Sequence, residues 1–212
     1  MNLPNQLTLL RLCLVPAFMI FMLVDNVWTR LAALLLFTAA SITDWYDGRV
    51  ARRTGTVTVV GTFLDPLVDK MLIAAALVGF VGMPELHIPA WMVVLIISRE
   101  FLITGLRSLA AARGVVLGAE RAGKFKTTSQ ITAIIVILGV LILNSALERW
   151  PVLLGAGWQD DTAAQVLERM PYWLVFWVAI TTIVSGYFYI QNHMDLLKKE
   201  FSMRNSQPGR QR

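Results

Sequence analysis

Residues 131–143 read ITAIIVILGVLIL, a run without a charged side chain. Together with the polar residues that precede it, this run forms the segment 127–143. The length of the segment is close to the roughly 20 residues that a helix needs to cross a bilayer core. Five further apolar segments share this character, at 7–24, 29–47, 59–81, 88–112 and 172–190. Lipid offers exposed backbone amides no partner, and these runs lack the alternation of membrane β-strands. The sequence therefore predicts an all-α, polytopic integral membrane bundle of six transmembrane helices.

The composition supports a membrane protein. Of the 212 residues, 56% are hydrophobic and only 16% are charged, which is more apolar than an average soluble domain. The single cysteine, Cys13, lies in an apolar stretch, so we expect no intramolecular disulfide. The net charge of +5 comes from basic residues scattered between apolar spans, a pattern typical of contact with anionic membrane lipids. We therefore expect membrane lipids, and no nucleic acid, as partners.

The basic residues also predict the orientation. They follow the second, fourth and sixth predicted spans, as Arg49, Arg52, Arg53, Arg113, Arg121, Lys124, Lys126, Lys198, Lys199, Arg204, Arg210 and Arg212. Basic loops stay on the cytoplasmic side, so we expect a multi-pass protein of the cell inner (plasma) membrane with both termini in the cytoplasm. The start of the chain lacks the charge cluster and cleavage site of a signal peptide, so the first span is expected to remain.

The domain organisation is expected to be simple, because neither an internal repeat nor a linker is visible. We expect a single transmembrane domain over residues 1–200 and a basic, disordered cytoplasmic tail over 201–212. The longest connection, 144–171, is expected to be an external loop with a short amphipathic segment.

Ionisable residues interrupt the apolar spans, where a charge costs a few kcal/mol or more. They are Asp44, Asp47, Asp65, Asp69, Lys70, Arg99, Glu100 and Arg107. Buried salt bridges, such as Arg99 with Glu100 or Lys70 with an aspartate, are one explanation. The four aspartates need a different explanation, because they gather on two neighbouring segments.

The spacing of the aspartates predicts a shared site. Asp44 and Asp47 are three residues apart, and Gly61, Asp65 and Asp69 recur every four residues on the next helix. A short connection makes the two helices antiparallel neighbours, so their charged ends meet at the cytoplasmic interface. Clustered carboxylates repel one another, and a hard divalent cation relieves that repulsion. The sequence therefore predicts a Mg²⁺ or Mn²⁺ site.

The glycines beside these aspartates allow two interpretations. Gly48 and Gly61 remove side chains where a bulky phosphate ligand, or another helix backbone, comes close. Both interpretations remain open.

A longer pattern extends over the same residues. Asp44 to Asp69 read DWYDGRVARRTGTVTVVGTFLDPLVD, which fills every position of D-x-x-D-G-x-x-A-R-x8-G-x-x-x-D-x-x-x-D. This resembles the signature of the CDP-alcohol phosphatidyltransferase family. The resemblance implies the six-helix membrane fold of that family, usually homodimeric, with a polar cavity open to the cytoplasm and a divalent metal between the second and third helices.

Site roles follow from the same resemblance. It implies that Asp44, Asp47 and Asp65 are metal ligands, and that Asp69 lies at the metal and acts as the base toward the acceptor hydroxyl. The remaining signature positions would contact CDP-diacylglycerol, namely Gly48, Ala51, Arg52 and Gly61.

Weaker candidates border the signature. Thr58 precedes Gly61 and is a candidate phosphate contact, although a solvent-exposed threonine explains it equally. The opening NLPNQLTLLR resembles the glycerophosphate-transferring branch of the family, which implies that Asn5, Thr8 and Arg11 border the nucleotide site.

Basic residues on and after the fourth span predict a site for a phosphorylated acceptor. They are Arg99, Arg107, Arg113, Lys124 and Lys126; the ordinary basic character of cytoplasmic loops is the alternative. SREFLITGLR and GKFKTTSQ resemble the members that use glycerol 3-phosphate. The implied reaction gives phosphatidylglycerophosphate and CMP from CDP-diacylglycerol and sn-glycerol 3-phosphate. Related members use inositol phosphate, phosphatidylglycerol or serine.

Two functions of other classes each fit part of the sequence. Intramembrane aspartates and the Asp65-Pro66 pair also suit an ion or proton transporter with a broken helix. The clustering of charges toward one face and the absence of an inverted repeat in the sequence argue against that function. A non-catalytic scaffold would leave the complete aspartate set unexplained.

Overall fold

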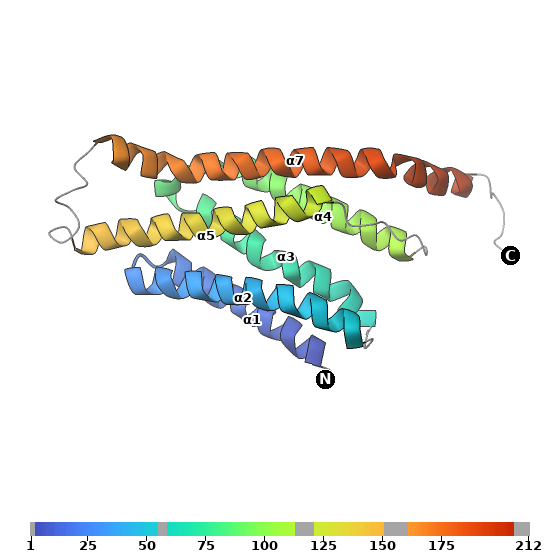
Figure 1. The fold of residues 1–212 in the computed structure, drawn as a ribbon, viewed down its shortest axis with the longest axis horizontal. Helices are drawn as coiled ribbons and strands as arrows, with labels where there is room; N and C mark the ends of the chain where they lie inside the picture. Colours follow the sequence, from blue (N-terminus) through green and yellow to red (C-terminus); the bar gives the residue numbers. More distant parts are fainter. Residues whose placement is uncertain (1–2, 55–58, 113–120, 151–160, 206–212) are drawn as a thin grey trace.

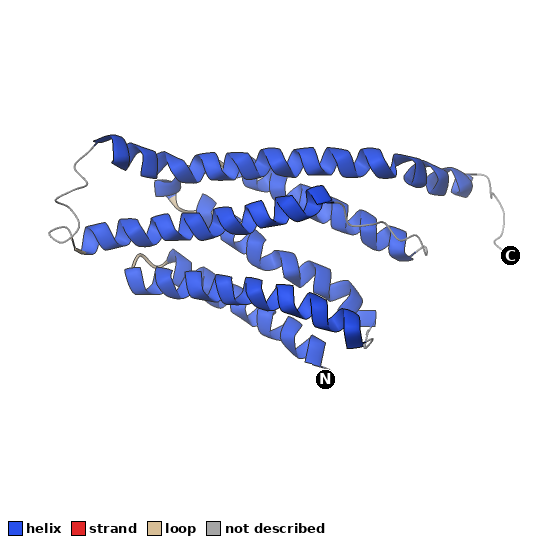
Figure 2. Ribbon diagram, viewed as in Figure 1, coloured by secondary structure: helices blue, strands red, loops and turns tan. Residues whose placement is uncertain are grey.

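The computed structural model describes residues 3–54, 59–112, 121–150 and 161–205. All regular structure in these residues is helical (Figure 2), so the all-α prediction is confirmed. The helices are α1 (Leu3–Leu23), α2 (Val27–Thr54), α3 (Val59–Val81), the 3₁₀ turn η1 (Pro84–Leu86), α4 (Ala90–Ala112), α5 (Arg121–Arg149) and α7 (Asp161–Asn205).

The helices run back and forth along one long axis (Figure 1). α1 packs against α2 and α3, α5 packs against α2 and α7, and α4 packs against α3 and α7. α2 ends and α3 begins at the same end of the bundle, where α4 also ends and α5 begins. We call this the α2–α3 end. The opposite end carries η1 and is called the η1 end.

Helix boundaries differ most from expectation around the connection predicted at 144–171. α5 continues to Arg149, and α7 begins at Asp161 and passes through Pro171 without ending. The prediction of a loop was therefore wrong at both of its ends. α7 also continues to Asn205, so residues 201–205 of the expected tail are helical. The reason is that hydropathy marks only the apolar part of a helix, while Ala, Leu, Glu and Gln favour helix beyond it.

Two of the described helices are long and apolar enough to cross a bilayer. They comprise Phe125–Arg149 and Gln165–His193. Within the described residues, α2 and α3 contribute the shorter apolar stretches Val27–Thr43 and Lys70–Val81. Large apolar side chains, including Trp28, are exposed on the outside of the bundle, as suits a lipid-facing surface. The number of six spans stays a prediction.

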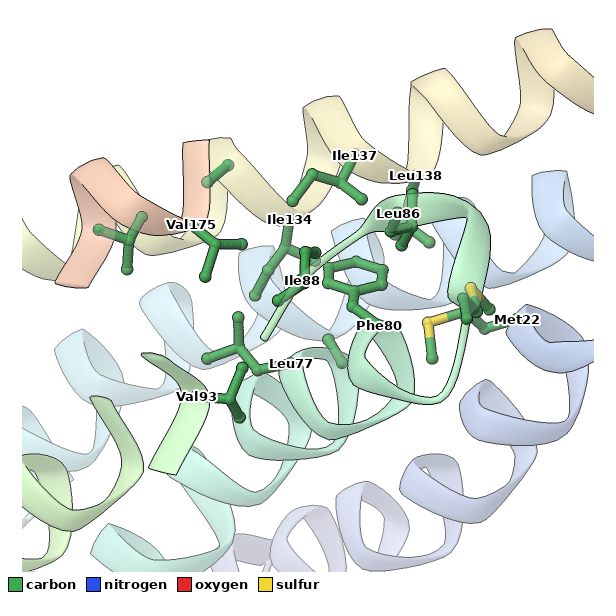
Figure 3. Packing of buried hydrophobic residues seen from close by; sticks show 14 of the residues in the cluster. Met22, Leu77, Phe80, Leu86, Ile88, Val93, Ile134, Ile137, Leu138 and Val175 are labelled. Carbon is green, nitrogen blue, oxygen red and sulfur yellow. The ribbon is translucent and has the colours of Figure 1, made fainter. Parts of the chain in front are cut away.

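The hydrophobic core holds the helices together between the two ends. Leu77 and Phe80 of α3 meet Ile134 and Leu138 of α5, with Val175 of α7 alongside (Figure 3). All of these side chains are buried. Burying each contributes roughly 1.5–3 kcal/mol when water is the reference; in lipid, close packing supplies the contribution instead.

A buried arginine ties four elements together at the η1 end. Arg30 of α2 is 4% exposed. Its Nη1 donates to the carbonyl of Leu141 at 3.1 Å and to Ser145 Oγ at 2.7 Å, and its Nη2 donates to Glu85 Oε1 at 2.9 Å. Ser145 Oγ in turn donates to Asp25 Oδ1 at 3.0 Å. The network therefore fixes α2 against α5, η1 and the α1–α2 connection, away from the predicted site.

Replacing this arginine is expected to destabilise the bundle. Arg30→Met keeps much of the side-chain volume but removes the guanidinium donors of the network, which should lower the free energy of unfolding by about 2 kcal/mol. Thermal unfolding of the detergent-solubilised protein measures the change. Arg149→Met, at an exposed position of the same end, is the matched control. Equal melting temperatures for Arg30→Met and the control would contradict a stabilising network.

Candidate functional site

The structure brings the two aspartate segments to one end of the bundle. Asp44 and Asp47 lie on α2 near its end, and Asp65 and Asp69 lie in the first half of α3. Both segments belong to the α2–α3 end (Figure 1). The backbone is helical at all four positions, so each pair lies within about one turn of its helix. The four side chains lie outside the described residues, and their convergence on a cation stays a prediction.

The other signature positions are placed by their backbone alone. Gly48, Ala51 and Arg52 lie on α2, and Gly61 lies on α3. Thr58 lies outside the described residues. The weaker candidates Asn5, Thr8 and Arg11 lie on α1, which begins at the α2–α3 end (Figure 1). Their predicted contacts stay untested.

A cavity of ≈ 130 Å³ lies next to the aspartate segments. Ser41, three residues before Asp44, and Lys70, directly after Asp69, both line it. Aliphatic side chains of α1, α3, α4 and α5 form much of the wall. The polar part of the wall is completed by Glu100, Thr127 and Gln130. The cavity is therefore apolar on one side and charged beside the signature.

Three cations converge on one carboxylate in this wall. Glu100 of α4 lies 3.5 Å from Lys70 Nζ of α3 and 3.3 Å from Arg99 Nη1. Lys126 Nζ of α5 contacts the same carboxylate. The side chain of Lys126 is only 2% exposed and that of Glu100 is 12% exposed, so water screens this cluster weakly. The Arg99–Glu100 salt bridge predicted from the sequence is confirmed. Glu100 is a described partner of Lys70, and the pairing of Lys70 with an aspartate stays a prediction.

Arg99 is held by a further helix. Its Nη2 donates to Ser185 Oγ of α7 at 2.9 Å. Gly186 follows Ser185, and a Cβ at that position would lie 3.2 Å from Arg99 Cγ. The missing side chain of Gly186 therefore allows the guanidinium to pass close to α7. Arg99 therefore connects α4 to α7 and also belongs to the group of cations around Glu100.

The structure joins two of the five basic residues predicted to bind the acceptor phosphate. Arg99 and Lys126 are joined through Glu100. Arg107 is exposed, about two turns farther along α4, and makes no ion pair with a described residue. Arg113 lies outside the described residues, and Lys124 is placed only as a residue of α5.

Sequence reasoning missed the roles of Glu100 and Gln130 in this wall and of Ser185 beside Arg99. It treated Glu100 only as a salt-bridge partner, and it did not single out Gln130 or Ser185. Gln130 is buried, lines the cavity, and has no described hydrogen-bond partner for its Nε2. Its spacing of four residues from Lys126 puts both on one face of α5, which is a signal that the sequence already contained.

A metal site cannot be built from the described side chains alone. None of them form a group of three or more His, Cys, Asp or Glu residues that could hold an ion. The four aspartates of α2 and α3 are not among those side chains. Their oxygen donors, spaced at three and four residues on two helices, suit Mg²⁺ or Mn²⁺.

The fold and the site agree with a family of membrane enzymes. The model of the CDP-alcohol phosphatidyltransferase family matches residues 1–185, including every aspartate of the signature, and the chain belongs to this family. The membership argues against the transporter and scaffold alternatives.

Individual relatives carry a more specific name. The chain is 41% identical over 211 residues to CDP-diacylglycerol--glycerol-3-phosphate 3-phosphatidyltransferase of Bacillus subtilis, covering 93% of this chain and 97% of that protein. The protein of the same name from Rickettsia felis is 34% identical over 191 residues, covering 90% and 94% of the two chains. That of Escherichia coli K12 is 39% identical over 139 residues, covering 63% and 74%.

Proposed function

We propose that the protein transfers the phosphatidyl group of CDP-diacylglycerol to sn-glycerol 3-phosphate, giving phosphatidylglycerophosphate and CMP. The observation that carries the proposal is the 41% identity to the Bacillus subtilis relative along nearly the whole of both chains. The buried Lys126 and the partly buried Lys70 and Arg99 support a phosphorylated acceptor, because ammonium and guanidinium groups are the usual partners of phosphate.

In this proposal the reaction is a direct displacement at phosphorus. A hydroxyl of glycerol 3-phosphate attacks the phosphorus that carries diacylglycerol, a new phosphorus–oxygen bond forms, and the bond to CMP breaks. Asp69 takes the hydroxyl proton, so the attacking oxygen is an alkoxide-like nucleophile as the bond forms. Gly48, Ala51, Arg52 and Gly61 hold the CDP part of the donor. Positioning does most of the work in such transfers.

The proposed cofactor is Mg²⁺, with Mn²⁺ as a substitute. Asp44, Asp47 and Asp65 would hold the ion together with Asp69. When bound, a divalent cation supplies charge neutralisation at the donor diphosphate and at the departing CMP. The support is the chemistry of the donor set, because carboxylate oxygens are the ligands that both ions prefer.

The proposed location is the inner membrane, with several spans and a cytoplasmic site. The basic residues of the α2–α3 end support this orientation through the positive-inside rule, and cytoplasmic glycerol phosphate then reaches the site directly. A homodimer, as the family resemblance implies, is part of the same proposal.

The test is product formation by the purified protein. Detergent-solubilised enzyme is incubated with CDP-diacylglycerol, labelled glycerol 3-phosphate and Mg²⁺, and CMP and the labelled acidic lipid are measured. We expect both products in equal amounts. Parallel reactions with serine, inositol phosphate or phosphatidylglycerol test the acceptor. CMP release only with another acceptor would reassign the acceptor, and no CMP with any of them would refute the transferase.

Arg107→Ala is expected to weaken acceptor binding. Arg107 lies about two turns from Glu100 along α4, so its loss removes attraction for the incoming phosphate and should raise the KM for glycerol 3-phosphate severalfold, with kcat nearly unchanged. The measurement is a series of initial rates at saturating CDP-diacylglycerol. Arg169→Ala, another exposed arginine but on α7 toward the η1 end, should behave as the wild type. An unchanged KM in Arg107→Ala would assign Arg107 to membrane topology instead.

A further inference from the structure

We infer that Glu100 is a positioning residue that assembles the acceptor-phosphate site. It would do so by drawing Lys70, Arg99 and Lys126 to one point beside the cavity. The inference rests on the proposed function. The basic residues bind the acceptor phosphate, and Glu100 holds them in place.

The first argument is geometric. The three cations come from three helices, α3, α4 and α5, and the carboxylate of Glu100 is the one described group that contacts all of them. One oxygen, Oε1, contacts both Arg99 and Lys126, while Oε2 contacts Lys70. Removing the carboxylate would therefore release contacts between α4 and two neighbouring helices at once.

The second argument is electrostatic. Three positive groups this close repel one another strongly where water screens them weakly, and Lys126 is only 2% exposed. Glu100 supplies one negative charge, so three cations and one anion leave a net charge of +2. A phosphate monoester carries about −1.5 to −2 at neutral pH. One such group is therefore opposite in sign to the summed charge of these four side chains.

The third argument is the location. Lys70 and Glu100 both line the cavity, and Lys70 directly follows Asp69, the proposed base. By holding Lys70, Glu100 also limits the rotation of α3 at Asp69. A phosphate bound to the cluster would therefore lie beside the part of α3 that carries Asp69.

The inference predicts a selective defect. Glu100→Gln keeps the size of the side chain and removes its charge, so the cations separate and the KM for glycerol 3-phosphate should rise about tenfold. The KM for CDP-diacylglycerol should stay within about twofold, because the donor contacts lie on α2 and α3. Glu100→Asp keeps the charge with a shorter reach, and its acceptor KM should lie between those of the wild type and Glu100→Gln.

Steady-state kinetics with both substrates varied is the deciding experiment, with inorganic phosphate as a competitive inhibitor in a second series. Its inhibition constant should rise in step with the acceptor KM. Glu148→Gln removes an exposed glutamate at the η1 end and is the matched control. If Glu100→Gln does not fold, the acceptor KM of Glu100→Asp is compared with that of the wild type. A higher KM in Glu100→Asp would support the positioning role.

Three results would overturn the inference. A wild-type acceptor KM in both variants, or an equal rise in both substrates' KM values, would leave Glu100 with a structural role only. A lower acceptor KM in Glu100→Gln would show that the carboxylate competes with phosphate. Failure of the wild-type enzyme to release CMP with glycerol 3-phosphate would refute the proposed function instead, so the two failures are distinguishable.

Discussion

Asp69→Asn is expected to lower kcat by about 10²–10⁴-fold, the usual contribution of a general base. The amide is close to the carboxylate in size but cannot take a proton from the acceptor hydroxyl. Asp44, Asp47 and Asp65 remain, so donor and metal binding should be retained in part. A fall in kcat with little change in either KM is the signature of a group that acts in the transition state.

The experiment combines turnover with a binding measurement. Initial rates give kcat and KM, and titration with CDP-diacylglycerol in the presence of Mg²⁺ gives the donor affinity of the inactive variant. Glu168→Gln, an exposed carboxylate on α7, is the control for loss of a negative charge. Wild-type turnover in Asp69→Asn would refute the role of Asp69 as the base.

Removal of divalent cations is expected to abolish activity, with a loss of about 100-fold or more and recovery on addition of Mg²⁺ or Mn²⁺. The physical reason is the proposed convergence of four aspartates from α2 and α3. Without a cation these carboxylates repel one another, and the diphosphate of the donor would add further negative charge.

A readout other than activity tests the same site. A ligand that binds only the folded protein stabilises it by about 2.7 kcal/mol at a concentration 100 times its Kd. Mg²⁺ should therefore raise the melting temperature of the EDTA-treated wild type by several degrees, and it should do so much less in Asp44→Asn. Full activity after chelation, or an equal thermal shift in both proteins, would exclude a cation at these aspartates.

The sequence predicted the fold class and the two helices that carry the signature well, because both depend on local spacing. Long apolar runs require helices in lipid, and α3 begins and ends at the predicted residues, Val59 and Val81. The signature from Asp44 to Asp69 placed its residues on two helices whose ends share one side of the bundle. Helix ends were predicted less well, because polar residues such as those before Pro171 continue a helix without any hydropathy signal.

The sequence by itself determined the class of fold, the aspartate signature and the family, since each is written in residues close together along the chain. Only the tertiary structure decided which charged groups from distant parts of the chain are partners. Arg30 and Ser145 are 115 residues apart, and Lys70, Glu100 and Lys126 lie on three helices. The physical reason is that a charge within an apolar bundle needs a counter-charge, and which one lies within reach depends on how the helices pack.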